Sequence, residues 1–186
     1  MLRSLVGSEM CIRDRYCVLA KMVGRPLNFK IQIDVPRRKS AMDRNSNLFK
    51  ISGESLADLR KFLRADGGFS EAEVIRRLWR IFRIDDKSIF DDDARRLASA
   101  FQIQGSSSFW VARVLDILAA KESVNIRRFE ATQAGVEEFQ GAEFVDINLD
   151  DCLLFNMPIT CVVFRPGNVD VTIFSGNAEF VGQMKS

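Results

Sequence analysis

The sequence predicts an α+β fold in which a central helical region, residues 70–131, lies between an N-terminal strand–loop–strand–helix and a C-terminal β-hairpin. Three observations lead to this prediction. Apolar residues recur at helical spacing through the centre of the chain. Towards the N-terminal end they alternate with polar residues, which is typical of a half-buried strand. Towards the C-terminal end they form short β-branched runs separated by a turn, which indicates a hairpin.

Residues 1–21 are expected to stand apart from this fold as a non-native or disordered leader. Residues 1–15 have no helical or strand periodicity, and Glu9, Arg13 and Asp14 interrupt any signal-peptide core. The string VGSEMCIRDR resembles translated sequencing-adapter read-through, which makes Met22 the expected natural start. A genuine N-terminal tail is the alternative. Without residues 1–21, Lys+Arg falls from 27 to 23 and Asp+Glu from 25 to 23, so the net charge falls from +2 to zero. Overall charge then gives no support for nucleic-acid binding.

Residues 22–69 are predicted to form a ββα element. Residues 28–35, NFKIQIDV, alternate between apolar and polar side chains and predict a strand that ends at Pro36. Residues 48–51 are expected to return as a short strand. A serine at 52 or 55 then begins a helix that ends before Gly67 and Gly68.

The loop between the two N-terminal strands is basic. Its cations are Arg37, Arg38, Lys39 and Arg44. Such a loop can contact phosphate or an acidic partner, although a simple exposed connection also explains it.

The central region is predicted to contain three helices. Ser70 and Glu73 fit a capping box for a helix that runs to Phe82. The carboxylates of 91–93 fit the start of a second helix, where they complement the helix dipole. A third helix is expected from Ser107 or Ser108, followed by a short turn over 125–130.

Residues 132–186 are predicted to be β-rich. The strand-like apolar runs are 144–147, 153–155, 159–164 and 169–174, and the turn at 165–168 makes 159–174 a hairpin. The long apolar runs of this hairpin predict burial on both faces, against the 28–35 strand. Cys152 and Cys161 lie in apolar sequence and are expected to be buried thiols.

The chain contains no histidine, which excludes Ser-His-Asp and Cys-His catalysis and His-based zinc sites. It also contains no CxxC, GxxxxGK[ST] or GxGxxG motif. An enzyme would have to use carboxylates, Lys, Tyr16 or Cys, for example at a concave site around Asp146–Cys152. The sequence has no run of ~18 apolar residues, so no membrane span is expected.

Residues 70–131 resemble a pair of EF-hands of the calmodulin or centrin kind. Trp79 and Phe82 resemble the aromatic residues that precede a metal loop. Ile89 and Val124 resemble the two residues at loop position 8, which pair across the two loops. The resemblance implies two helix–loop–helix units with 12-residue loops. Ordinary amphipathic helices with polar connectors are the alternative interpretation.

The metal ligands of an EF-hand are largely missing. The first loop offers Asp86, Asp91 and Asp93 as ligands for a weak calcium site, but Lys87 stands where the loop needs glycine. The second loop has Arg128 in place of the bidentate carboxylate. We therefore expect no cofactor, with calcium at the first loop as the less favoured alternative.

These observations predict a non-catalytic protein-binding or scaffold module, a subunit of a larger assembly in a reducing, cytoplasmic compartment. The expected partner is a protein, such as an amphipathic helix, bound in an apolar groove. The groove residues would be Val74, Leu78, Phe82, Leu97, Phe101, Val114, Leu115 and Leu118. A weak calcium-responsive regulator and a His-free enzyme are the alternatives.

Overall fold

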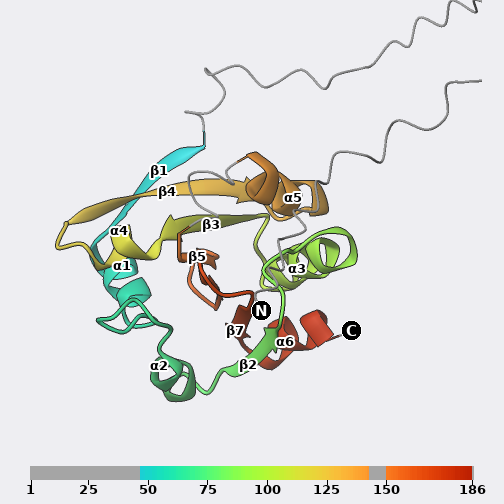
Figure 1. Cartoon of the computed structure of the whole chain (residues 1–186), viewed down its shortest axis with the longest axis horizontal. Coiled ribbons are helices and arrows are strands. Elements are labelled where there is room, and N and C mark those ends of the chain that lie inside the picture. The colour runs from blue at the N-terminus through green and yellow to red at the C-terminus, as the bar shows by residue number, and fades with distance from the viewer. Residues whose placement is uncertain (1–46, 143–149, 186) are drawn as a thin grey trace, which may run out of the picture. The chain divides into compact units, whose positions relative to one another are not determined.

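A seven-stranded antiparallel sheet carries helices on both of its faces (Figure 1). The computed structural model describes residues 47–142 and 150–185. The strands are β1 (Leu48–Ser52), β2 (Arg80–Ile84), β3 (Ser108–Arg113), β4 (Ser123–Glu130), β5 (Cys152–Phe155), β6 (Cys161–Arg165) and β7 (Thr172–Gly176). The helices are α1 (Gly53–Arg60), α2 (Glu71–Arg76), α3 (Asp91–Ile103), α4 (Val114–Leu118), α5 (Gln133–Ala142) and α6 (Ala178–Lys185).

The order of strands across the sheet is β1-β4-β3-β5-β6-β7-β2. Strands β5, β6 and β7 form a meander, and β3 joins it by pairing with β5. Strand β2 pairs with β7 at one edge, and β1 pairs with β4 at the other. The two edge strands therefore come from the earlier part of the described chain.

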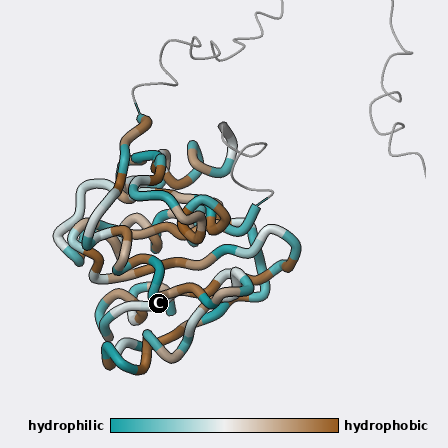
Figure 2. The backbone as a smooth tube through the Cα atoms, turned by 90° about the vertical axis from the view of Figure 1, so that its left-hand side faces the viewer, coloured by the Kyte–Doolittle hydropathy of each residue, from teal (hydrophilic) through white to brown (hydrophobic). Residues whose placement is uncertain are grey.

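The sheet separates two hydrophobic cores. Side chains alternate between its faces, so Phe109 and Val111 of β3 enter one core while Trp110 and Ala112 belong to the other. Strand β6 is buried at every position for the same reason. Figure 2 shows hydrophobic stretches in the strands and hydrophilic stretches in many of the connections.

Helices α3, α5 and α6 cover one face. The amphipathic α3 has a buried apolar stripe, and its Phe101 ring stacks on Phe109 at 5.2 Å and packs against Phe180 at 5.7 Å. The opposite face is covered by α1, α4 and the segment 61–69, with Phe62 and Leu59 fully buried. Both faces are therefore occupied by protein, which explains why the central strands are apolar throughout.

Several predicted elements are confirmed. The strand near 48–51 is β1, the helix after Ser52 is α1, and the run 153–155 lies in β5. The hairpin predicted over 159–174 is formed by β6 and β7, and Cys152 and Cys161 are free buried thiols. The stripe of the second central helix is the buried face of α3.

The prediction of a central helical EF-hand pair is wrong. The first helix ends at Arg76, and 80–84 form β2. The segments expected to be the third helix and the last turn form β3 and β4, with the short α4 between them. Aromatic and β-branched residues favour strands, and apolar side chains on both faces of β3 resemble a helical stripe when they are read from sequence alone.

The two residues expected to pair across EF-hand loops lie in different cores. Val124 pairs with Ile51 in the sheet, whereas Ile89 packs with the α3 side. The helices α5 and α6 were not predicted. The expected strands at 28–35 and 144–147 lie outside the described residues.

No helix in the ranges that the structure describes is long and apolar enough to cross a lipid bilayer.

Candidate functional site

The residues predicted to line one partner groove are divided between the two cores and the surface. Leu97 and Phe101 are buried on the α3 side, with Phe82 packed against them. Val74 and Val114 are buried on the other side, where Leu118 also packs. Leu78 and Leu115 are exposed. The sheet thus lies between the two buried groups, and only the exposed leucines are available to a partner.

Two of the three candidate metal ligands, Asp86 and Asp93, have other partners. The Asp86 Oδ1 accepts a hydrogen bond from the Ser88 backbone N–H at 2.7 Å. Asp93 forms an ion pair with Arg96 at 3.0 Å, and Asp91 is the first residue of α3. Within 47–142 and 150–185, no three His, Cys, Asp or Glu side chains converge on one point as metal ligands.

The basic loop residues Arg37, Arg38, Lys39 and Arg44 lie outside the described residues. So does Asp146, one end of the enzyme site considered from sequence. At its other end, Asp151 accepts the Gly167 backbone N–H at 2.6 Å, and burial raises the pKa of the Cys152 thiol to about 12. A thiol with so high a pKa carries almost no thiolate at neutral pH, so it is a poor nucleophile.

The end of α2 exposes two large apolar side chains, Ile75 and Leu78, which we call the α2 patch. Ile75 is 69% exposed and Leu78 is 91% exposed. Leu78 also adopts φ 57°, the left-handed region that favours glycine. Its backbone N–H bonds to the Ile75 carbonyl at 2.9 Å, and the Trp79 N–H bonds back to the Val74 carbonyl at 3.0 Å. This pattern ends the helix and turns the Leu78 side chain outwards.

The backbone below the α2 patch is tightly held. The Trp79 ring stacks on Phe62 with a centroid distance of 5.3 Å. The Arg77 guanidinium lies 4.6 Å from the Phe62 centroid and 5.1 Å from the Trp79 centroid. It also bonds to Glu73 at 2.7 Å and to Asp58 at 2.5 Å. The patch therefore stands on a cluster of aromatic and ionic contacts.

Glu73 contributes to this cluster. Its carboxylate accepts hydrogen bonds from Arg76 at 2.6 Å and from Arg77 at 2.7 Å. These contacts, that with Arg76 first, lower the pKa of Glu73 to about 2. The predicted capping box is absent, because Ser70 forms no side-chain cap and Glu73 faces the two arginines instead.

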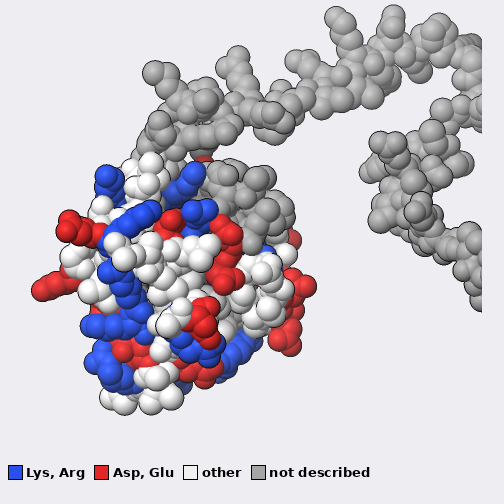
Figure 3. Space-filling model, turned by 60° about the vertical axis from the view of Figure 1, so that its left-hand side comes forward, with Lys and Arg blue, Asp and Glu red and all other residues white. Residues whose placement is uncertain are grey.

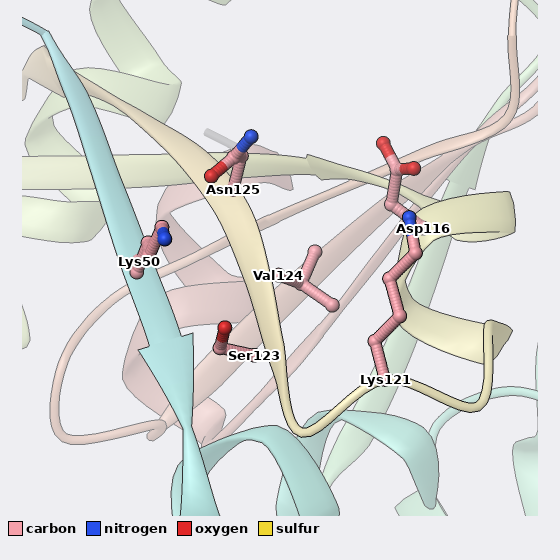
Figure 4. Close-up of a pocket in the computed structure, with 6 residues that line it drawn as sticks. All are labelled: Lys50, Asp116, Lys121, Ser123, Val124 and Asn125. Atoms are coloured by element: carbon pink, nitrogen blue, oxygen red, sulfur yellow. The ribbon is translucent and has the colours of Figure 1, made fainter.

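A second surface feature is a pocket of about 230 Å³ beside the edge of the sheet (Figure 4). It lies beside the part of β4 that extends past its pairing with β3. Strand β1 pairs with 123–127 of β4, whereas β3 pairs only with 127–130. In the described chain, 123–126 therefore pair with a strand on one side only. The pocket is lined by Lys50, Asp116, Lys121, Ser123, Val124 and Asn125.

Charges around this pocket are unevenly balanced. The Asp116 carboxylate forms an ion pair with Arg113, and the Arg113 Nε lies 2.9 Å from the Asp116 Oδ2. Among the residues that the structure describes, neither Lys50 nor Lys121 forms an ion pair with a carboxylate. Figure 3 shows Lys and Arg side chains in a band down the side of the molecule on which β1 and α1 lie, with carboxylates next to them.

Neither surface feature was identified from sequence. Leu78 fits an apolar helical stripe, so its exposure depends on where the backbone leaves α2. The pocket depends on the unequal lengths of two strand pairings, which no motif encodes. Helices often end with a glycine in the left-handed conformation. The sequence RRLWR at the end of α2 contains no glycine, so the left-handed position falls on Leu78.

Comparison of the chain with protein-family models, with curated proteins and with solved structures finds no match. The function therefore has to be argued from the residues of this chain.

Proposed function

We propose that this chain is a non-catalytic protein-binding module, a subunit of a larger assembly, which contacts its partner through the α2 patch. The observation that supports this proposal is the left-handed, almost fully exposed Leu78. A leucine in this conformation destabilises the free protein by about 1 kcal/mol relative to glycine. Its exposed side chain makes no packing contact in the described structure that would offset this strain. A contact with a partner protein would explain why a leucine stands at this position.

The charge around the patch indicates the chemistry of the partner. Leu78 is flanked in sequence by Arg76 and Arg80, which are both exposed. The buried carboxylate of Glu73 in α2 is bound to Arg76 and Arg77. An apolar partner pocket with carboxylates at its rim would complement this surface. Such rim charges mainly accelerate association and make it sensitive to salt.

The rigidity below the patch favours the same function. Arg77, Phe62 and Trp79 hold the turn in one conformation. A side chain presented by a fixed backbone loses little conformational freedom when it binds. Ile75, in the last turn of α2, supplies a second exposed apolar side chain three positions before Leu78 in the sequence.

Binding should be tested with the whole chain and two variants. Leu78→Asn removes the apolar side chain but keeps the backbone conformation, because asparagine tolerates the left-handed region. Val169→Asn, at a position that is 57% exposed in the β6–β7 connection, is the matched control. A photo-crosslinker at position 75 should form an adduct with a specific protein in extract of the source cells.

The proposal requires that the crosslinked protein also binds the purified chain and its Val169→Asn variant, and that Leu78→Asn weakens this binding at least about tenfold. The affinity should also fall with added salt. Equal binding by Leu78→Asn and the parent chain, or no specific adduct at position 75, would show that the α2 patch is not a docking surface.

A further inference from the structure

We infer that the partner protein adds an extended segment as a further strand along the free edge of β2, with carboxylates opposite Arg80 and Arg83. This inference rests on the proposed function, because the segment belongs to the partner that contacts the α2 patch. Strand β2 ends the sheet on one side, and Figure 1 shows it at the rim, between α2 and α6. One of its edges pairs with β7, and among the described residues no strand pairs with the other. The backbone N–H and C=O groups of such an edge are a template for another strand.

The pairing of β2 is regular along its whole length. It runs without a bulge from Arg80 opposite Gly176 to Ile84 opposite Thr172, and the strand contains no proline. Bulges and prolines are devices that commonly prevent a second chain from joining an exposed edge. Since β2 has neither, its charges are the feature that selects what can pair with it.

The apolar side chains of β2 are incompletely covered. Ile81 packs against the core on the α1 side of the sheet, whereas Phe82 and Ile84 pack against the core on the α3 side. All three are only partly buried, because the sheet ends at β2. An added strand places its own side chains beside them on both faces. It would therefore bury apolar surface as well as pair backbone groups.

The charges of β2 favour an acidic partner segment. Residues 76–84 contain four arginines and no carboxylate. Both arginines of β2, Arg80 and Arg83, are exposed, and Arg80 forms no ion pair with any residue that the structure describes. Arg83 pairs with Glu71 at 2.6 Å, but these side chains are 43% and 56% exposed, and an ion pair so exposed contributes little. Carboxylates on an added strand would form cross-strand pairs with both arginines.

The same charges disfavour a second copy of this chain on the edge. Two β2 strands paired edge to edge would bring Arg80 and Arg83 of both copies into one short segment, and like charges opposite each other are destabilising. A foreign antiparallel strand avoids this repulsion. It needs apolar residues opposite 84, 82 and 81 and acidic residues opposite 83 and 80. From its N-terminal end it then reads valine–glutamate–valine–valine–glutamate, with valine as the apolar residue.

The edge is continuous with the α2 patch. Leu78 lies two positions before Arg80, the first residue of β2, so at most about 7 Å of backbone separates them. A protein that covers Leu78 thus comes next to the start of β2. The patch and the edge can therefore be contacted by one partner.

The test is a titration of the whole chain with the capped peptide threonine–valine–glutamate–valine–valine–glutamate–threonine, followed by amide chemical shifts and amide exchange. Saturable binding with a Kd of roughly 1 mM or lower is expected. Shifts and slowed exchange should occur at 80–84 and not at 48–52 of β1, the other rim. A peptide with lysines in place of the glutamates should bind at least about tenfold more weakly. Arg80→Glu should reverse this preference. Lys121→Glu makes the same change in net charge away from β2 and should leave the preference unchanged.

Backbone pairing is tested with two N-methylated forms of the acidic peptide, each methylated at one set of alternate residues. Alternate amides of a strand point to opposite edges, so only one of the two forms should lose binding. The inference is overturned if binding does not saturate, if both methylated forms bind as well as the parent peptide, or if the lysine peptide binds equally well. Shifts at β1 in place of β2 also overturn it. Protection of 80–84 that rises with protein concentration in the free chain would assign the edge to a second copy.

The edge and the α2 patch are tested separately. Leu78→Asn should bind the acidic peptide as the parent does, because Leu78 lies outside the pairing at 80–84. Loss of peptide binding in this variant would mean that the peptide docks on the patch, against the inference. Failure of partner docking at the patch leaves peptide binding unchanged, so the two failures are distinguishable. Urea unfolding of each variant shows that it is folded.

Discussion

The side-chain amide of Gln140 pairs with the backbone of Ile89 through both of its polar atoms. Its Oε1 accepts the Ile89 N–H at 2.8 Å, and its Nε2 donates to the Ile89 carbonyl oxygen. Both residues are buried. The amide of α5 thus supplies the hydrogen bonds that a neighbouring strand would otherwise provide to the segment before α3.

Replacing this amide should be costly. Gln140→Leu leaves a buried N–H and a buried carbonyl without these partners, so we expect a loss of about 2–4 kcal/mol in unfolding free energy. Urea denaturation measures the loss. Gln102→Leu is the control with a smaller expected loss. The Gln102 side-chain amide donates to the Ala131 carbonyl at 2.6 Å, and removing this bond should lower the unfolding free energy by about 1 kcal/mol. Equal losses in the two variants would contradict the paired role of Gln140.

The strain at Leu78 can be separated from its side chain by two substitutions. Leu78→Gly relieves the left-handed backbone, whereas Leu78→Ala retains a Cβ at φ 57°. Since neither variant loses a buried contact, the glycine variant should be more stable than the alanine variant by about 1 kcal/mol. Thermal and urea unfolding provide the comparison. An alanine variant at least as stable as the glycine variant would mean that the turn relaxes in solution.

Gly135 allows α5 to start against β4. A Cβ at this position would lie 3.0 Å from the Glu130 carbonyl carbon and still closer to its oxygen. Because these are backbone atoms, Gly135→Ala should destabilise the protein by about 1–3 kcal/mol. Gly182→Ala is the matched control in α6, where a Cβ meets nothing within 4 Å. There alanine should add about 0.5–1 kcal/mol of stability. Unfolding curves showing the same sign of change at both positions would contradict this account.

Stability should depend on pH through Glu73. Its pKa is about 2 in the folded protein and 4.5 in its ordinary state. A carboxyl group whose folded pKa is lowered stabilises the fold above the unfolded pKa, and this contribution is lost as the pH falls towards the folded pKa. We therefore expect the free energy of unfolding, measured by urea denaturation, to fall by an amount on the order of 1–2 kcal/mol between about pH 4.5 and pH 2. The Glu73→Gln variant should lack this part of the decline. An identical pH profile for parent and variant would exclude Glu73 as its source.

Sequence reasoning succeeded where a segment has one apolar and one polar face. In α3, the buried Leu97 and Phe101 recur at helical spacing while Arg95 and Arg96 lie outside that stripe, so no strand fits the pattern as well. It failed at β3, where Phe109 and Trp110 enter opposite cores. A run that is apolar on both faces contains helical spacings by default, and only its place in the sheet identifies it as a strand.

The candidate sites were less accessible to sequence than the fold. Leu78 follows Val74 and Ile75 at a helical interval, which predicts a place on a helix that lines an apolar partner groove. The actual helix stops at Arg76, and the turn sends Leu78 into solvent. Lys50 and Lys121 are 71 positions apart in the sequence, and they share a pocket because of the registers of β1 and β3 on β4. Long-range pairing of this kind is absent from local patterns.

The order of strands also bears on how the protein is made. Strands β1 and β2 leave the ribosome first and form the two rims of the sheet, whereas β5 and β6, which join its halves, are synthesised after residue 151. Strand β3 can pair with β5, and β2 with β7, only after these later strands have been synthesised. A nascent chain that stops before Cys152 therefore contains both rims without the centre between them. Its exposed apolar strands would make it a substrate for chaperones until β5, β6 and β7 have been synthesised.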